Sequence, residues 1–470
     1  MPDRGITSNA EPDVPSSSPT LSVLARLLLA AIFSWALFVD AFMTSAMVIS
    51  LDKIGLELGV TASVIPWLIT AYNLTFGSFL LLAGRISDMY HPKPVFVTGF
   101  FLLGVLGIGG GFSQDIITFI VIRAFQGIGA AMTIPSATSM LTAIYTTPKS
   151  QGLVLTMQES SQVYSCEFFA AAGTLGLSLG FALGGVLLQF ATWRWVLWIV
   201  PVLTIPLSIV SYFFIPKKIR LLSTHSQKQL DVIGILTLIG SLILLIYALS
   251  QAPINGWATS IVLAPLLVSL LMMGVFFFRQ TRLPEYQAVI PTKMWFIPNF
   301  SVLVFVSFCT QINLTGPILV LSQYWPIAYH WTPLSIGLHV LPMGLTSTLV
   351  CILLPRQILQ LPPRPALVGA SSMAGLSSIL LVYSSSREKY WSFTFPSLIL
   401  ITVGSTAAYM ISKSCSVGIV MSVPSEQVGV AAAIFSAAQQ VGSAINIAIL
   451  TTILVQLLDQ HPYPSYTALS

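Results

Sequence analysis

Long apolar runs separated by short polar breaks follow one another from residue 24 to residue 456. Most runs hold about 20 residues, the length that an α-helix needs to cross the hydrocarbon core of a bilayer. The strict alternation of apolar and polar residues that is typical of membrane β-strands does not occur. The pattern predicts about thirteen transmembrane helices, at residues 24–48, 64–83, 94–112, 116–144, 168–190, 194–214, 232–250, 258–278, 300–320, 334–354, 366–384, 393–413 and 428–456.

The composition supports lipid as the main solvent. Hydrophobic residues make up 55% of the 470 residues and charged residues only 7%, whereas a soluble domain carries roughly 25% charged residues. The net charge is +5, but the basic residues are scattered through short loops and form no stripe, so nucleic acid is excluded as an expected partner. The four cysteines and five histidines show no metal-binding spacing, so no metal or cofactor is expected.

The distribution of Lys and Arg between the loops predicts the orientation of the chain. If the N-terminus is cytosolic, the inner loops hold thirteen basic residues and the outer loops hold four, which favours this orientation. The inner set is Arg85, Lys93, Lys149, Lys217, Lys218, Arg220, Lys228, Arg279, Arg282, Lys293, Arg356, Arg364 and Lys413, and the outer set is Lys53, Arg194, Arg387 and Lys389.

Two of the inner loops resemble each other. The run GRISDMYHPKP begins at Gly84, and a second run, RQILQLPPRP, begins at Arg356. In each run two basic residues stand eight positions apart, and the run closes on a Pro-basic-Pro sequence. The two loops lie at corresponding positions if the chain contains two related halves of six spans, an arrangement known among transporters.

At the first of these loops the sequence resembles the major facilitator superfamily, specifically the fungal fourteen-span drug:proton antiporters of the aminotriazole-resistance type. Gly84, Asp88 and Lys93 match the family's loop signature, while His91 and Pro92 replace its Gly and Arg. The resemblance implies that this loop and its twin form a gate on the inner face. The expected gating residues are Gly84, Arg85, Asp88, Lys93, Arg356 and Arg364, and the alternative is an ordinary basic inner loop.

Two charged residues, Asp40 and Arg123, stand well inside predicted spans and away from the span ends. Arg123, in IRAFQGIGAA, matches the family's span-four motif, and Asp40, in FVDAFMTSAM, matches its span-one pattern. Both lie roughly 10–12 Å from the outer end of their helices, and buried charges in a membrane are costly unless they are paired or wet. We expect Asp40 and Arg123 to pair and Asp40 to carry the coupling proton. A structural ion pair without a role in transport, or an Arg123 side chain that extends to the surface, are the alternatives.

A third motif, GTLGLSLGFALGG, resembles the antiporter motif of span five, although the family's proline is not evident. Glycines at helical spacing let two helix backbones approach closely. We expect Gly173, Gly176, Gly180, Gly184 and Gly185 to form this packing surface, and the motif is associated with export in the family.

Polar and aromatic side chains within the spans are the candidates for a substrate cavity. A cavity lined with aromatic rings and amides suits an amphipathic organic solute, while hydrogen bonds between helices are the structural alternative. The candidates are Trp67, Tyr72, Asn73, Gln126, Gln311, Gln439 and Asn446.

We therefore predict an all-α polytopic membrane protein with the major facilitator fold, two six-helix bundles and two additional central spans, with the family's last span missing. The expected parts are a disordered cytosolic tail at 1–22, an N-terminal bundle at 23–215, a linker with two extra helices at 216–298, a C-terminal bundle at 299–456 and a polar tail at 457–470.

The predicted function is proton-coupled export of small organic compounds, such as drugs, toxins or secondary metabolites, by alternating access. The alternatives are a membrane sensor or receptor on the same fold and an importer of a small polar solute. An enzyme is not expected, because no nucleophile–His–acid set and no phosphate-binding loop occurs. The expected partners are the small substrate, protons and lipid, with the chain a monomer in the plasma membrane or, alternatively, the vacuolar membrane.

Overall fold

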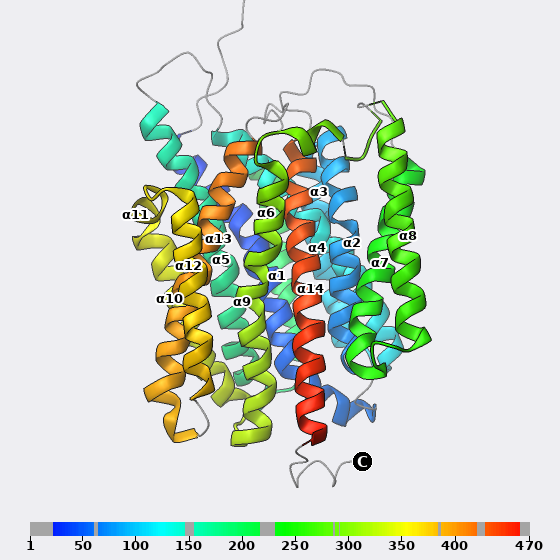
Figure 1. Ribbon diagram of the computed structural model, residues 1–470, viewed down its shortest axis with the longest axis vertical. Coiled ribbons are helices and arrows are strands. Elements are labelled where there is room, and N and C mark those ends of the chain that lie inside the picture. The colour runs from blue at the N-terminus through cyan, green and yellow to red at the C-terminus, as the bar shows by residue number, and fades with distance from the viewer. Residues whose placement is uncertain are drawn as a thin grey trace, which may run out of the picture.

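The computed structural model describes residues 22–60, 64–145, 155–216, 231–284, 287–290, 292–383, 387–420 and 428–460. Every regular element in these residues is helical (Figure 1), and twelve helices are long and apolar enough to cross a membrane. Helices are expected here because the backbone N–H and C=O groups inside a bilayer have no water to bind, and a helix pairs them internally. The predicted all-α, many-spanning membrane fold is confirmed.

Eight long helices make up the first part of the described chain. They are α1 (Val23–Leu58), α2 (Trp67–Met89), α3 (Pro92–Gly111), α4 (Ile116–Tyr145), α5 (Leu155–Phe190), α6 (Arg194–Phe214), α7 (Val232–Asn255) and α8 (Ser260–Arg282).

A short 3-10 turn, η1 (Thr292–Phe296), leads into the second part. This part holds α9 (Phe300–Tyr329), α10 (Pro333–Leu353), the five-residue α11 (Pro355–Leu359), α12 (Pro363–Val382), η2 (Arg387–Lys389), the π-helical turn η3 (Tyr390–Thr394), α13 (Phe395–Val420) and α14 (Val428–Gln460). With α9, which has 30 residues, each of the thirteen predicted spans has a helix at its position.

Several helices extend beyond the predicted apolar runs. The helix α1 continues to Leu58 and α5 begins at Leu155, so both have 36 residues. Hydropathy marks only the segment that lies in hydrocarbon, whereas a helix can continue into the interface. The predicted tails at 1–22 and 457–470 lie outside the described residues, apart from Ser22 and the end of α14.

The helices pack in two groups with a peripheral pair. In the first group α1 packs on α5, and α4 packs on α2 and α3; in the second group α9 packs on α13 and α14, and α13 packs on α10 and α12. The groups meet where α5 lies against α10 and where α2 lies against α14. The pair α7–α8 stands beside α2 and α14 at one edge of the molecule (Figure 1).

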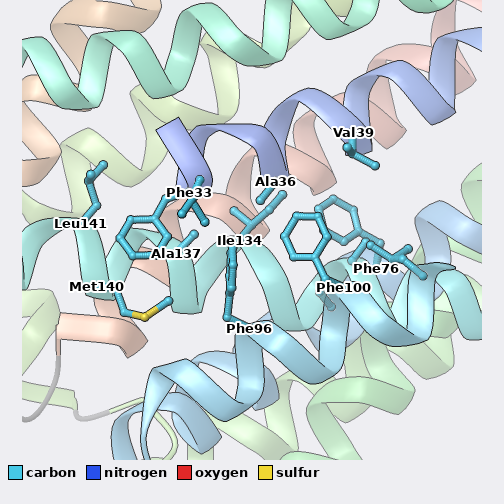
Figure 2. Packing of buried hydrophobic residues seen from close by; sticks show 14 of the residues in the cluster. Phe33, Ala36, Val39, Phe76, Phe96, Phe100, Ile134, Ala137, Met140 and Leu141 are labelled. Carbon is cyan, nitrogen blue, oxygen red and sulfur yellow. The ribbon is translucent and has the colours of Figure 1, made fainter. Parts of the chain in front are cut away.

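Aromatic and aliphatic side chains fill the first group. Phe33 from α1 meets Phe96 from α3 with ring centroids 5.6 Å apart, edge to face, and Phe96 meets Phe100 at 4.9 Å. Figure 2 shows these rings gathered with Phe76 from α2 and Ile134 from α4. Because lipid is as apolar as this core, close packing rather than removal of water holds the helices together.

A polar network fixes α7 and α8 at one end. The carboxylate of Asp231 accepts hydrogen bonds from the Gly234 N–H at 3.0 Å, from Arg279 at 2.8 Å and from the Gln280 amide at 3.0 Å. The Gln280 carbonyl oxygen in turn accepts the Val289 N–H at 2.8 Å. Val289 is buried in an apolar cluster with residues of α2, α7 and α14, so the α7–α8 pair also holds the segment that leads into α9.

Candidate functional site

Asp40, Tyr72 and Arg123 form one cluster in the first group of helices, on α1, α2 and α4. The Tyr72 hydroxyl donates a hydrogen bond to Asp40 Oδ1. The guanidinium carbon of Arg123 lies over the Tyr72 ring, 4.5 Å from its centroid. Tyr72 and Arg123 are fully buried, and Asp40 is half-buried. Asp40 and Arg123 are therefore connected through the Tyr72 side chain.

The other contacts of Arg123 are made within α2 and α4. Its Nε–H donates to the carbonyl oxygen of Leu68 at 3.0 Å, and its Nη1–H donates to Gln126 Oε1 at 3.1 Å. Arg123 Nη2 and Gln126 Nε2 are buried and have no hydrogen-bond partner among the described residues. Leaving a buried donor unpaired costs about 1–3 kcal/mol, so the cluster holds donor capacity that this conformation does not use.

A glycine makes this geometry possible. A methyl group at Gly127 would lie 2.1 Å from Thr75 Oγ1 and 2.3 Å from the carbonyl oxygen of Tyr72. At the same level the Thr75 hydroxyl donates to the Ala124 carbonyl oxygen at 2.6 Å. Only a residue without a side chain lets the backbones of α2 and α4 come this close, and their approach places the Arg123 guanidinium over the Tyr72 ring.

The expected pairing of Asp40 with Arg123 takes an indirect form. Among the described residues the two ion pairs are Arg194 with Glu57 and Arg279 with Asp231, and Asp40 has its contact with Tyr72 instead. Tyr72, which we expected in the substrate cavity, thus lies between the two charges. Gln126, also expected there, is bound to Arg123 and fully buried.

The other cavity candidates do not join this cluster. The Trp67 ring lies 5.7 Å from the Tyr247 ring on α7, at the outer edge of the first group. Asn73 is half-buried on α2. Gln439 and Asn446 are buried on α14, and Gln439 Nε2 has no hydrogen-bond partner among the described residues. The side chain of Gln311 lies outside the described residues.

Comparison with known proteins identifies the family. The sequence model of the Major Facilitator Superfamily matches residues 33–446, most of the chain. The chain belongs to the major facilitator superfamily. It is 28% identical over 412 residues to the puromycin resistance protein pur8 of Streptomyces alboniger, covering 86% of this chain and 77% of that protein.

Two further matches are a yeast transporter and a solved human transporter structure. A low affinity ammonium transporter of Saccharomyces cerevisiae is 27% identical over 419 residues, covering 87% of this chain and 78% of the transporter. The crystal structure of the human organic anion transporter MFSD10 superposes with a TM-score of 0.65 at 13% identity, covering 92% of this chain and 94% of that one. At this identity the superposition supports the superfamily fold alone.

The expected gating loop is short and well ordered by local contacts. Only Tyr90 and His91 separate α2 from α3. His91 Nδ1 accepts the Lys93 N–H at 3.2 Å, and Pro92 occupies the first position of α3. His91 and Pro92, which depart from the family signature, thus form the cap and the first residue of α3, and proline is favourable at the first position of a helix.

The basic residues of the two predicted gating loops have different surroundings. Gly84 and Arg85 are buried, and the side chain of Asp88 lies outside the described residues. Lys93 is buried, and its Nζ donates to the carbonyl oxygen of Ile215, at the end of α6, at 2.5 Å. In the twin loop Arg356 and Arg364 are exposed, so the two loops are similar in sequence but not in environment.

The span-five glycines lie at close helix contacts. Methyl groups at Gly176 and Gly180 would lie 2.3 Å and 2.4 Å from the carbonyl oxygens of Phe38 and Phe42 on α1. Gly173 and Gly184 also face α1, whereas Gly185 faces α10, with its added methyl 2.7 Å from the Pro333 carbonyl oxygen. The motif therefore brings α5 against both groups of helices.

Sequence reasoning missed two clusters. Glu57, near the end of α1, pairs with Arg194 and accepts the Trp193 indole N–H at 2.7 Å. The His339 ring on α10 stacks on the Trp331 ring at 4.0 Å. The first cluster has a sequence signal, since oppositely charged residues stand at neighbouring helix ends, while the second has no signal in linear order.

Proposed function

We propose that this superfamily member is a proton-coupled exporter of small organic compounds that works by alternating access. The observation that carries the proposal is the Asp40–Tyr72–Arg123 cluster, which puts a half-buried carboxylate and a fully buried guanidinium inside a bundle of apolar helices. Charges in such a place are expensive and mark functional sites in membrane proteins. When the carboxyl group gains or loses a proton, the free-energy cost of burying it changes. Protonation is thereby coupled to the conformation of the helices around it.

The driving force available to such a cycle is sufficient for accumulation. One proton entering the cell releases about 2.3 kcal/mol per 100 mV of membrane potential and about 1.4 kcal/mol per unit of pH difference. The α5–α10 and α2–α14 contacts are the surfaces that would separate in turn as the central site faces one side and then the other.

The substrate class is proposed from the relatives. The matched puromycin resistance protein supports export of a small organic compound. Within the superfamily we place the chain in the fourteen-span drug:proton antiporter branch, of the aminotriazole-resistance type, on the loop, span-four and span-five motifs. The plasma membrane is the proposed site, because export to the medium requires it.

A second candidate is transport of a small cation. It rests on one relative, the low affinity ammonium transporter of yeast. For this candidate the carboxylate of Asp40 would bind the cation, since it attracts positive charge.

An efflux assay in yeast lacking its own pumps separates these functions. We expect cells that express the chain to accumulate less puromycin than cells that express Asp40→Asn, and we expect addition of a protonophore to remove the difference. Uptake of methylammonium that depends on expression would favour the second candidate. Binding of a compound to the purified protein without any counterflow in proteoliposomes would favour a sensor and contradict both.

A further inference from the structure

Tyr72 separates the two charges of the proposed proton site, and its position has a consequence for proton exchange. The geometry assigns Tyr72 the role of a positioning residue that holds Asp40 through its neutral hydroxyl group, in place of a direct ion pair between Asp40 and Arg123. This inference rests on the proposed function of Asp40 as the proton carrier and adds the group that makes the carrier usable.

A direct ion pair with Arg123 would hold the Asp40 carboxylate tightly. An arginine binds a carboxylate through two parallel N–H···O contacts, which are among the strongest hydrogen bonds in proteins. A carboxylate held in this way stays charged over most of the useful pH range. A proton carrier held so tightly would neither take up nor release its proton during a transport cycle.

Arg123 and Asp40 each bind other partners instead of each other. The Nε and Nη1 groups of Arg123 are bound to the Leu68 carbonyl oxygen and to Gln126 Oε1, and the Tyr72 ring covers the guanidinium. Asp40 receives the Tyr72 hydroxyl as its donor. A single neutral donor stabilises the carboxylate less than a bidentate guanidinium does, so protonation remains within reach.

Buried contacts hold Tyr72 in place. Its side chain is fully buried, and its ring stacks against the Phe76 ring with centroids 6.0 Å apart. Its carbonyl oxygen lies so close to Gly127 that no side chain fits there. The ring therefore has little freedom to move aside, and Asp40 stays at its hydroxyl group while Arg123 stays over its face.

No other charge in the described structure competes for Asp40. On the helices packed against α1, the described contacts place two titratable groups at or near the Asp40 carboxylate. These are Tyr72, which donates to it, and Arg123, which lies over the Tyr72 ring. Described residues of α5 between 171 and 190 include no titratable group. On α6, Arg194 and Tyr212 stand near the two ends of the helix, at Glu57 and Lys93.

The variant that tests the inference is Tyr72→Phe. The ring and its contact with Arg123 remain, and only the hydroxyl donor to Asp40 is removed. Without that donor the charged carboxylate is less stable, so Asp40 should hold its proton to higher pH. The loss of one hydrogen bond to a charged group should move the midpoint by about 1–2 pH units.

The measurement is an infrared pH titration of the reconstituted protein, followed by the C=O band of the protonated carboxyl group. Asp40→Asn identifies the band by removing it. Tyr247→Phe, a hydroxyl deletion at the ring that faces Trp67, is the matched control and should leave the midpoint unchanged.

A second variant protects the test if Tyr72→Phe does not fold. Incorporation of 3-fluorotyrosine at position 72 keeps the ring and makes the hydroxyl a stronger donor, so the midpoint should move to lower pH. Midpoints unchanged in the variants that fold would overturn the role of Tyr72. If the Tyr72 variants shift the midpoint as expected but the wild-type protein transports nothing on a pH gradient, the proposed function is overturned instead. The two failures are therefore distinguishable.

Discussion

Gly127→Ala should weaken the protein at a close contact between α2 and α4. The added methyl group would stand 2.3 Å from the carbonyl oxygen of Tyr72, whereas atoms in ordinary contact are about 3.5 Å apart. The two helices must therefore separate by about 1 Å. The bond from Arg123 Nε to the Leu68 carbonyl oxygen, now 3.0 Å, would then lengthen to about 4 Å, beyond hydrogen-bond range.

The expected loss of stability combines two effects. Overfilling a packed interface costs about 1–3 kcal/mol, and a hydrogen bond from a charged donor contributes about 1.5–3 kcal/mol. The better helix propensity of Ala returns up to about 1 kcal/mol. The net destabilisation should be about 1.5–6 kcal/mol.

The assay is unfolding in mixed micelles with increasing SDS, followed by tryptophan fluorescence. Gly274→Ala is the matched control, because no atom lies within 4 Å of a methyl group at that position on α8. It should be neutral or slightly stabilising. If Gly127→Ala were as stable as Gly274→Ala, the close α2–α4 contact and the placement of Arg123 that depends on it would be refuted.

Three further changes test other contacts. Asp231→Asn keeps the helix cap but removes a negative charge. Burial alone would raise the pKa of the Asp231 carboxyl group, but its hydrogen bonds hold that pKa below the ordinary value of 3.8. The variant should melt a few degrees below the wild type at neutral pH, and this difference should shrink only as the pH falls below about 4. Equal melting at pH 7 would contradict this. Lys93→Met removes the donor to the Ile215 carbonyl oxygen and should cost about 1–3 kcal/mol in the same unfolding assay, against no change if that contact is unimportant. Gly337→Val places a side chain against α5, where even a methyl group would lie 2.5 Å from a backbone oxygen, and should destabilise the protein by about 1–3 kcal/mol. Gly369→Val is the control, because a side chain at that position enters open space. Similar losses of stability in both variants would contradict the close α5–α10 contact.

Hydropathy predicted the helices well because lipid imposes one requirement on every span, namely an apolar run of sufficient length. Asp40 and Arg123 could also be found, since a charge inside such a run is rare and costly. Family resemblance pointed to the span-five glycines before any helix contact was visible. Each of these features can be recognised in the sequence of a single helix.

What could not be predicted depends on how helices turn toward one another. Trp67 and Tyr72 are five residues apart on α2, yet one meets α7 and the other meets Asp40. Lys93 was expected in a gate, and its described contact is with the end of α6. In a membrane nearly every helix surface is apolar, so the hydrophobic pattern does not show which side faces a neighbour.

The most direct test of the central claim is transport by purified protein in proteoliposomes, with Asp40→Asn compared with the wild type. A compound found in the efflux assay is followed first in exchange without a gradient and then under an imposed pH gradient. We predict that Asp40→Asn keeps the exchange but loses gradient-driven accumulation. Accumulation equal to that of the wild type would contradict proton coupling through Asp40.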